Sequence, residues 1–207
     1  MRQDYSMGYQ VPGGSMVRSV FASGMRLVRQ TILPPVCLAC DAGVAVQGVV
    51  CARCWSSLRH IEQPWCAVLG SPFSYDLGKG ALSAAAIANP PVFDRARSVV
   101  LYDDVARQLV QGMKFSDRTD LAPWMARWMV RFCERAESDF LTPDMLIVPV
   151  PLHKSRLISR RFNQSAELAR VFARETRTTY AHEVLLRTRS TKQQVGLGAK
   201  ERQRNVR

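Results

Sequence analysis

The chain lacks the features of several large protein classes. None of its 207 residues belongs to a run of eighteen or more apolar residues, which argues against a conventional transmembrane helix. The amino-terminal residues have neither the compact apolar stretch nor the small-residue cleavage site of a secretory signal peptide. We therefore expect a soluble, cytoplasmic protein, in which cysteine thiols stay reduced.

The familiar catalytic patterns are also missing. We find no Walker-type phosphate loop, no Ser/His/Asp set and no paired catalytic carboxylates, because the adjacent Asp103 and Asp104 are more typical of a helix start. Aromatic residues make up 8% of the chain. Only Phe162, Phe172 and Tyr180 lie in its last quarter, so the sequence indicates no base-stacking platform there.

Positive charge is abundant and unevenly distributed. The formal net charge is +12, and residues 1–152 hold 15 Lys/Arg against 13 Asp/Glu, whereas residues 153–207 hold 14 against 4. A concentrated positive region favours an anionic partner, either a nucleic acid or a phosphorylated small molecule. The alternative is a basic tail that only keeps the protein soluble.

Two Cys-x-x-Cys pairs stand ten residues apart in the stretch "CLACDAGVAVQGVVCARC". A structural zinc ion takes four tetrahedral sulfur or nitrogen ligands, and each Cys-x-x-Cys turn supplies two of them. Reduced thiols and the paired spacing argue against redox disulfides and against a chance grouping. We predict a structural zinc site with four ligands, Cys37, Cys40, Cys51 and Cys54, in two small hairpins of a zinc ribbon.

The composition divides the chain into four parts. Residues 1–33 form an extension with one amphipathic helix, which either packs on the body or contacts a membrane surface. A third alternative is an over-long start, since Met16 and Met25 offer later start positions. Residues 34–70 form the zinc ribbon, 71–93 a connector, and 94–207 an α/β region. No internal repeat stands out beyond the paired cysteines.

The α/β region begins with a strand and two helices. We expect the strand over residues 96–102 and helices over 103–115 and 120–136. Apolar residues of the longer helix recur at helical spacing and are expected to form core, namely Leu121, Trp124, Met125, Trp128, Met129 and Phe132. Cys133, on the same helix, is expected to be buried.

A strand, a polar loop and a helix follow. The strand is expected over residues 144–152, the loop over 153–164 and the helix over 165–176. This order is typical of a phosphate-binding unit, in which loop amides and the helix N-terminus favour anions. Four cations, Lys154, Arg156, Arg160 and Arg161, lie in that loop. His153 precedes them but is a weak signal alone.

These segments together resemble the ComF family of competence-associated proteins. The resemblance covers roughly residues 34–207 and depends on "PPVFDRARSVVLYDDVARQLVQGMKF", "VPVPLHKSRLISRRFNQSAELA" and "LLRTRSTKQQVGLGAKERQRNVR". The most specific matches are Pro149, Pro151, Arg156, Phe162, Asn163, Gln164, Thr191, Gln194, Arg202 and Asn205.

The resemblance implies a fold and two functions. The fold would be α/β, with a small N-terminal zinc ribbon followed by a type I phosphoribosyltransferase-like domain. One implied function is DNA uptake, with single-stranded DNA and other DNA-uptake proteins as partners. The other is a phosphoribosyltransferase that uses phosphoribosyl pyrophosphate and magnesium on an unknown acceptor. The expected phosphate- or nucleic-acid-binding residues are Lys154, Arg156, Arg160, Arg161, Asn163 and Gln164. A third reading is that the zinc ribbon alone acts, by docking a partner.

The chain departs from the family pattern in three respects. A second four-cysteine set, common in the family, is reduced here to Cys66, with Leu69, Ser83 and Ala86 at the other three positions. Arg161 replaces a usual glycine. The acidic pair and Thr-Thr-Gly-type turn that hold the diphosphate are not in the 207 residues. We therefore expect a truncated chain that lacks its C-terminal strands, exposes apolar strand faces and is inactive as an enzyme.

Overall fold

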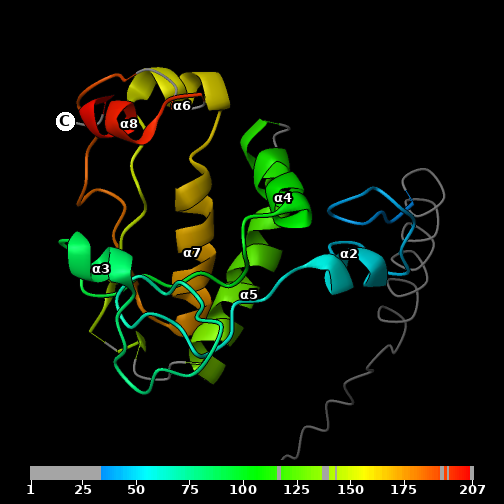
Figure 1. Cartoon of the computed structure of the whole chain (residues 1–207). Coiled ribbons are helices and arrows are strands. Elements are labelled where there is room, and N and C mark those ends of the chain that lie inside the picture. The colour runs from blue at the N-terminus through cyan, green and yellow to red at the C-terminus, as the bar shows by residue number, and fades with distance from the viewer. Residues whose placement is uncertain are drawn as a thin grey trace, which may run out of the picture.

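Three helices form the centre of the protein. A computed structural model describes residues 34–115, 118–136, 140–142, 144–191, 194 and 196–205 (Figure 1). The helix expected in residues 1–33 lies outside the described residues. The central helices are α4 (Asp104–Phe115), α5 (Leu121–Ala136) and α7 (Gln164–Thr176), as the apolar periodicity predicts.

The core lies on the two sides of α5. On one side, Ala126, Val130 and Cys133 pack against Val171 and Phe172 of α7, and each of these residues is at most 7% exposed. On the other side, Leu121 and Ala122 of α5 pack against α4 and the N-terminal ribbon. That second cluster comprises Leu38, Leu58, Ala106, Leu109, Met113, Leu121 and Ala122. The predicted burial of Cys133 is confirmed.

The described residues contain one small parallel sheet. Strand β1 (Leu146–Ile147) pairs with β2 (Thr179–Tyr180), with Leu146 opposite Thr179. The chain passes from β1 to β2 through α6 (Lys154–Arg160) and α7, which makes a β-α-β crossover. Leu146 of β1 is 56% exposed, so the expected exposure of an apolar strand face is seen at that residue.

The loop predicted over residues 153–164 is wrong, because α6 occupies most of it. The His153 side chain caps this helix by accepting a hydrogen bond from the backbone N–H of Ser155. The stretch from Lys154 to Arg160 contains neither glycine nor proline, and its final arginine favours a helix C-terminus. A stretch with so many charged residues is typical of a loop, yet its backbone is helical. The helix ends at the C-cap residue Arg161, which has a φ of 61°.

The strand predicted over residues 96–102 is also wrong. Only one antiparallel bridge forms there, between His60 and Val100, and backbone hydrogen bonds on each side join Ile61 to Val99 and Leu101 to Arg59. The partner segment is the short link after the first ribbon. Among the described residues, no longer strand lies beside residues 96–102, so the pairing is limited to this one bridge.

Three shorter helices complete the described structure. Helices α2 (Ala52–Ser57) and α3 (Ala84–Ala88) lie in the N-terminal half, and α8 (Ala199–Asn205) lies near the end of the chain. Figure 1 shows α2 on one side of the molecule and both α6 and α8 at its other end. Helix α3 falls in the residues predicted as a connector.

Candidate functional site

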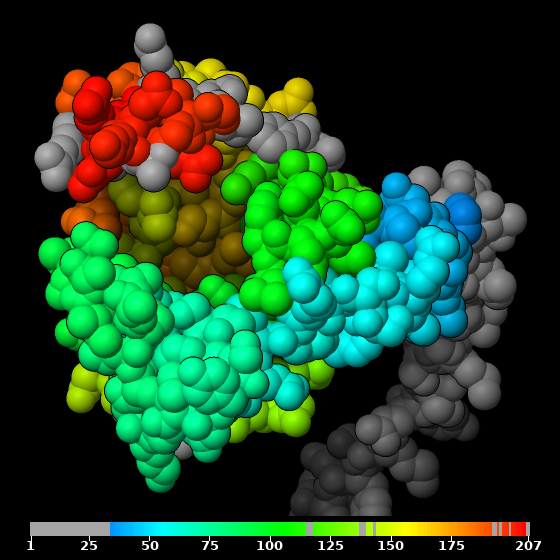
Figure 2. Space-filling view, viewed as in Figure 1, coloured from blue at the N-terminus to red at the C-terminus, as the bar shows by residue number. Residues whose placement is uncertain are grey.

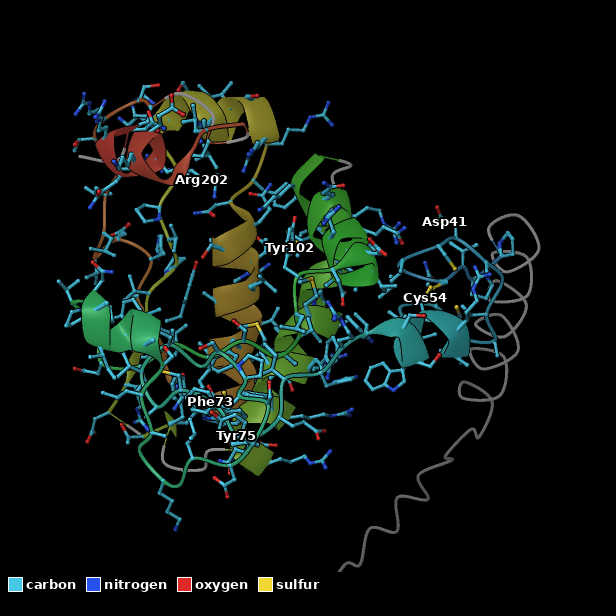
Figure 3. All side chains as sticks on the ribbon, viewed as in Figure 1. Asp41, Cys54, Phe73, Tyr75, Tyr102 and Arg202 are labelled. Carbon is cyan, nitrogen blue, oxygen red and sulfur yellow. The ribbon has the colours of Figure 1, made fainter. Side chains whose placement is uncertain are left out.

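The four predicted zinc ligands converge on one point. One sulfur from each of Cys37, Cys40, Cys51 and Cys54 lies within 4.8 Å of the other three. The sulfurs of Cys40 and Cys51 are 3.8 Å apart. Figure 3 shows sulfur atoms gathered beside Cys54, between the first turn of the ribbon and α2. The two cysteine turns therefore come together as their spacing predicts.

Backbone N–H groups surround these sulfurs. The Cys37 sulfur accepts hydrogen bonds from Ala39, at 3.4 Å, and from Cys51, at 3.2 Å. Cys51 is the N-cap of α2, and its sulfur accepts from the N–H of Cys54. Burial raises the pKa of the Cys37 thiol, but backbone N–H groups outweigh burial and lower it to about 6. The site is thus built to hold thiolate sulfur.

A soft dication fits this donor set. Burial and the three neighbouring cysteines raise the pKa of Cys54, because four clustered thiols cannot all ionise without a compensating charge. Zinc supplies that charge, and four sulfurs at tetrahedral spacing are its usual structural shell. The residues present therefore fit a structural zinc ion.

A second unit repeats the backbone of the first. Cys66 corresponds to Cys37, and its sulfur likewise accepts two backbone hydrogen bonds, from Leu69 at 3.4 Å and from Ser83 at 3.3 Å. Three backbone hydrogen bonds recur at matching positions: Cys37 to Ala42 and Cys66 to Ser71, Leu38 to Val49 and Ala67 to Ala81, Val44 to Pro35 and Phe73 to Pro64. In the sequence, these positions are indicated only by the family resemblance, since no repeat stands out beyond the paired cysteines.

The second unit does not fit a zinc ion. Ser83 takes the place of Cys51 and caps α3 by accepting a hydrogen bond from the N–H of Ala86. Ala86 takes the place of Cys54 and is buried. Among the described residues, Cys66 is therefore the one sulfur ligand of this unit, where zinc would need four ligands. The buried Ala86 stands where the first unit has a metal ligand.

The backbone of residues 96–97 covers this second unit. Ala96 donates its N–H to the Val68 carbonyl, and the Arg97 guanidinium donates to the Ala67 carbonyl. Gly70 has a φ of +64°, and a Cβ there would lie 2.4 Å from the Ala96 carbonyl oxygen. Glycine is required at this close approach.

The predicted basic residues lie mainly on α6. The Arg156 guanidinium donates to the Thr191 carbonyl at 2.6 Å, and Arg187 donates to the Thr191 hydroxyl at 2.5 Å. Burial, and then the charges of Arg187 and Arg160, lower the pKa of Arg156. No carboxylate is among the groups that shift this pKa, so the charges of Arg187 and Arg160 act on Arg156 without an opposing carboxylate.

Two other predicted residues hold the start of α7. The Asn163 side chain caps the helix by accepting from the N–H groups of Ser165 and Ala166, and it donates to the Val150 carbonyl. Gln164 is buried, and its Oε1 accepts from Arg160 at 3.5 Å, while its Nε2 has no partner in the described part of the chain. Both residues therefore position the loop and helix.

More cations lie next to α6. The cleft between residues 189–191 and α8 has a volume of about 430 Å³, and Arg189, Arg204 and Glu201 line it. Helix α8 also exposes Lys200 and Arg202, the second of which is labelled in Figure 3. We call α6, residues 187–191 and α8 together the basic end.

A larger cleft lies at the carboxyl end of β1. Its volume is about 730 Å³, and it is lined by the Pro149–Pro151 turn, by Lys154, by the first turn of α7 and by Arg187. In parallel β-α-β units, ligands bind beyond the carboxyl ends of the strands. Glu167 is the one carboxylate in this lining, against the two cations.

The apolar stripe predicted on α5 is confirmed in part, because Met129, which was expected in the core, is 37% exposed. Trp124, Met125 and Trp128 of α5 do pack against the core cluster, as their spacing predicts. Trp124 also contacts Trp55 of the first ribbon, and Trp128 contacts His60 of the link after that ribbon. Nothing in helical periodicity identifies this second contact, because it joins segments far apart in the chain.

Comparisons with known proteins agree with the double ribbon and with the motifs. The family model for a double zinc ribbon domain matches residues 28–86. The DNA utilization protein YhgH of Escherichia coli is 28% identical over 173 residues, which are 83% of this chain and 68% of that protein. Its Salmonella typhimurium counterpart is 28% identical over 84% of this chain and 76% of that protein.

A further relative has the name of the family that the sequence resembles. Competence protein F of Haemophilus influenzae is 24% identical over 176 residues, or 82% of this chain and 73% of that protein. The resemblance to the ComF family is therefore confirmed. No solved structure matches the chain. In the described part of the chain, no helix is both long enough and apolar enough to cross a membrane.

Proposed function

We propose that this relative of competence protein F binds single-stranded DNA during DNA uptake, and that its basic end makes the phosphate contacts. The observation that carries the proposal is that Arg156 and Arg187 both donate to Thr191, at the same end of the molecule as the exposed Lys200 and Arg202 of α8. Phosphates could contact several of these cations at once. The relatives are named for DNA utilization and for competence. We place this function in the cytoplasm, with other DNA-uptake proteins as further partners.

The zinc site has a structural role in this proposal. Its four cysteines hold the first ribbon, and the apolar residues Leu38 and Leu58 fasten that ribbon to α4 and α5. The third reading from the sequence, in which the ribbon alone docks a partner, stays a prediction. The ribbon is packed into the same core as the helices.

Salt dependence tests this function. Each neutralised phosphate of a single strand contributes roughly −0.7 to the slope of log affinity against log salt. If four cations of the basic end contact phosphates, affinity for oligo(dT) falls about 50-fold between 50 and 200 mM salt. Fluorescence anisotropy with the full zinc-loaded chain measures this, and affinity that is flat over that range contradicts the proposal.

Matched variants locate the contacts. The double variant Arg202→Gln with Arg204→Gln removes two exposed charges from α8 and is expected to reduce the salt slope by about 1.4. The control is Arg174→Gln, which removes an exposed charge from the last turn of α7, away from the basic end. If the control changes the slope as much per charge as the α8 variant, the basic end is not the contact surface.

A second candidate ligand is phosphoribosyl pyrophosphate, with magnesium. The cleft at the end of β1 supports it, because Lys154, Arg187 and the first turn of the 13-residue α7 lie there and the unpartnered Gln164 amide is near. We propose binding without transfer for these 207 residues, since they contain no acidic-pair segment. Calorimetry with phosphoribosyl pyrophosphate, with and without magnesium, tests binding, and pyrophosphate release would contradict the absence of transfer.

A further inference from the structure

Four aromatic rings meet where the first ribbon contacts α5. Trp55 comes from α2, His60 from the link after it, and Trp124 and Trp128 from α5. The Trp55 and Trp128 ring centroids are 5.1 Å apart, and the His60 centroid is 5.0 Å from that of Trp128. The rings are tilted or edge-on to one another, and no pair of them is stacked in parallel.

This group is not closed off as core. Trp55 is 44% exposed and His60 is also exposed, although tryptophan usually buries most of its surface. Beside them lies a cleft of about 510 Å³, which Trp55, Trp128 and Phe132 help to line. That volume is in the range of small-molecule and nucleotide-sized pockets. The rings therefore offer apolar faces to a flat ligand.

Positive charge lines the same cleft. Arg131 and Arg135 follow Trp128 at helical spacing on α5 and are both exposed. Neither takes part in an ion pair among the described residues, and Glu62 is the one carboxylate in the lining. Exposed aromatic rings beside unpaired arginines are the combination that binds single-stranded nucleic acids, with bases on the rings and phosphates on the cations.

We propose that this cleft, which we call the tryptophan cleft, is a second contact for single-stranded DNA. One or two bases stack on Trp55 and Trp128, and the flanking phosphates contact Arg131 and Arg135. The inference rests on the proposed DNA binding and names a separate site for it. Duplex DNA is excluded as the occupant, because its bases are already stacked on each other and offer no free faces.

The zinc site and the tryptophan cleft are linked by α2. Trp55 directly follows Cys54 and lies on the helix that Cys51 caps. Holding both cysteines on one zinc ion therefore also orients the Trp55 ring. Figure 1 places α2 on the opposite side of α4 and α5 from the basic end, so one strand contacting both sites would pass across the helices. Figure 2 shows a hollow below α8 and beside α4, with α7 at its bottom.

Paired oligonucleotides separate base stacking from phosphate binding. The probes are oligo(dT) and an abasic oligomer of equal length, which has the same phosphates but no bases. For the full zinc-loaded chain we expect oligo(dT) to bind about 5- to 150-fold more tightly for each stacked base. Oligo(dT) should also quench tryptophan fluorescence, and the abasic oligomer should not.

Variants assign the effect to the cleft. Trp55→Ala is expected to remove most of the preference for oligo(dT) while leaving affinity for the abasic oligomer unchanged. Tyr75→Ala is the matched control, because Tyr75 is 68% exposed in the second unit, where Figure 3 labels it. Arg131→Gln with Arg135→Gln leaves the rings intact and is expected to reduce the salt slope for oligo(dT) by about 1.4. If Trp55→Ala folds poorly, the double arginine variant tests whether DNA contacts the cleft.

The outcomes distinguish the two proposals. Equal affinity of the intact chain for both oligomers overturns the tryptophan cleft and leaves the basic end standing. Failure to bind either oligomer overturns both proposals. A preference for oligo(dT) that survives Trp55→Ala overturns the inference, and so does a salt slope that the double arginine variant leaves unchanged. Duplex binding that quenches the tryptophans equally would overturn it as well.

Discussion

The clearest quantitative prediction concerns the number of zinc ions. Two units with the same backbone hydrogen bonds differ in their donors, with four sulfurs in the first and Cys66 alone in the second. We therefore expect one zinc ion per chain. Cys66→Ala should leave this count at one, whereas Cys51→Ala should reduce it to near zero.

The effect of removing zinc depends on the free energy of zinc binding compared with the stability of the folded domain. Apparent free energies for structural zinc in small ribbons are about 10–16 kcal/mol, which equals or exceeds the whole stability of a typical domain. Chelation should therefore unfold the first ribbon. Because Leu38 and Leu58 belong to the same buried cluster as α4, the loss should also loosen that helix. The second unit should keep its backbone protection, since the covering contacts from Ala96 and Arg97 do not involve the metal.

Elemental analysis and native mass spectrometry measure the count, and hydrogen exchange follows the two units separately. The equivalence of the units predicts more: Leu69→Cys, Ser83→Cys and Ala86→Cys together should raise the content to two zinc ions. Two ions in the unaltered chain, or a folded triple variant that still holds one, would refute the reasoning.

Two further changes test the packing. Gly70→Ala should destabilise the protein by more than about 1 kcal/mol, because its φ is +64° and the new Cβ would meet the Ala96 carbonyl at 2.4 Å; an unchanged urea midpoint would count against this. Phe172→Ala should cost about 3–5 kcal/mol, since Phe172 is 7% exposed between α7 and α5; a loss under 1 kcal/mol in urea denaturation would mean the α5–α7 contact is not central.

Local features of the chain could be predicted from the sequence. The zinc ligands depend on residue type and short spacing, so Cys37, Cys40, Cys51 and Cys54 were identified before any fold was known. Helices α4, α5 and α7 could be predicted because the apolar residues of an amphipathic helix recur at helical spacing on its buried face. The phosphoribosyltransferase-like fold and the truncation stay predictions that depend on the family resemblance.

Long-range pairing decided the remainder. Residues 96–102 have strand-like sequence, but a strand needs a partner, and one bridge to His60 is what the described neighbours provide. The second unit copies the first through backbone hydrogen bonds, which carry no sequence signature once three cysteines are absent. The tryptophan cleft exists only because α2 packs against α5, bringing Trp55 to Trp128 across more than seventy residues of chain. Sequence thus determined the ligands and the helix faces, while tertiary contacts determined which of those faces meet and which stay open to a ligand.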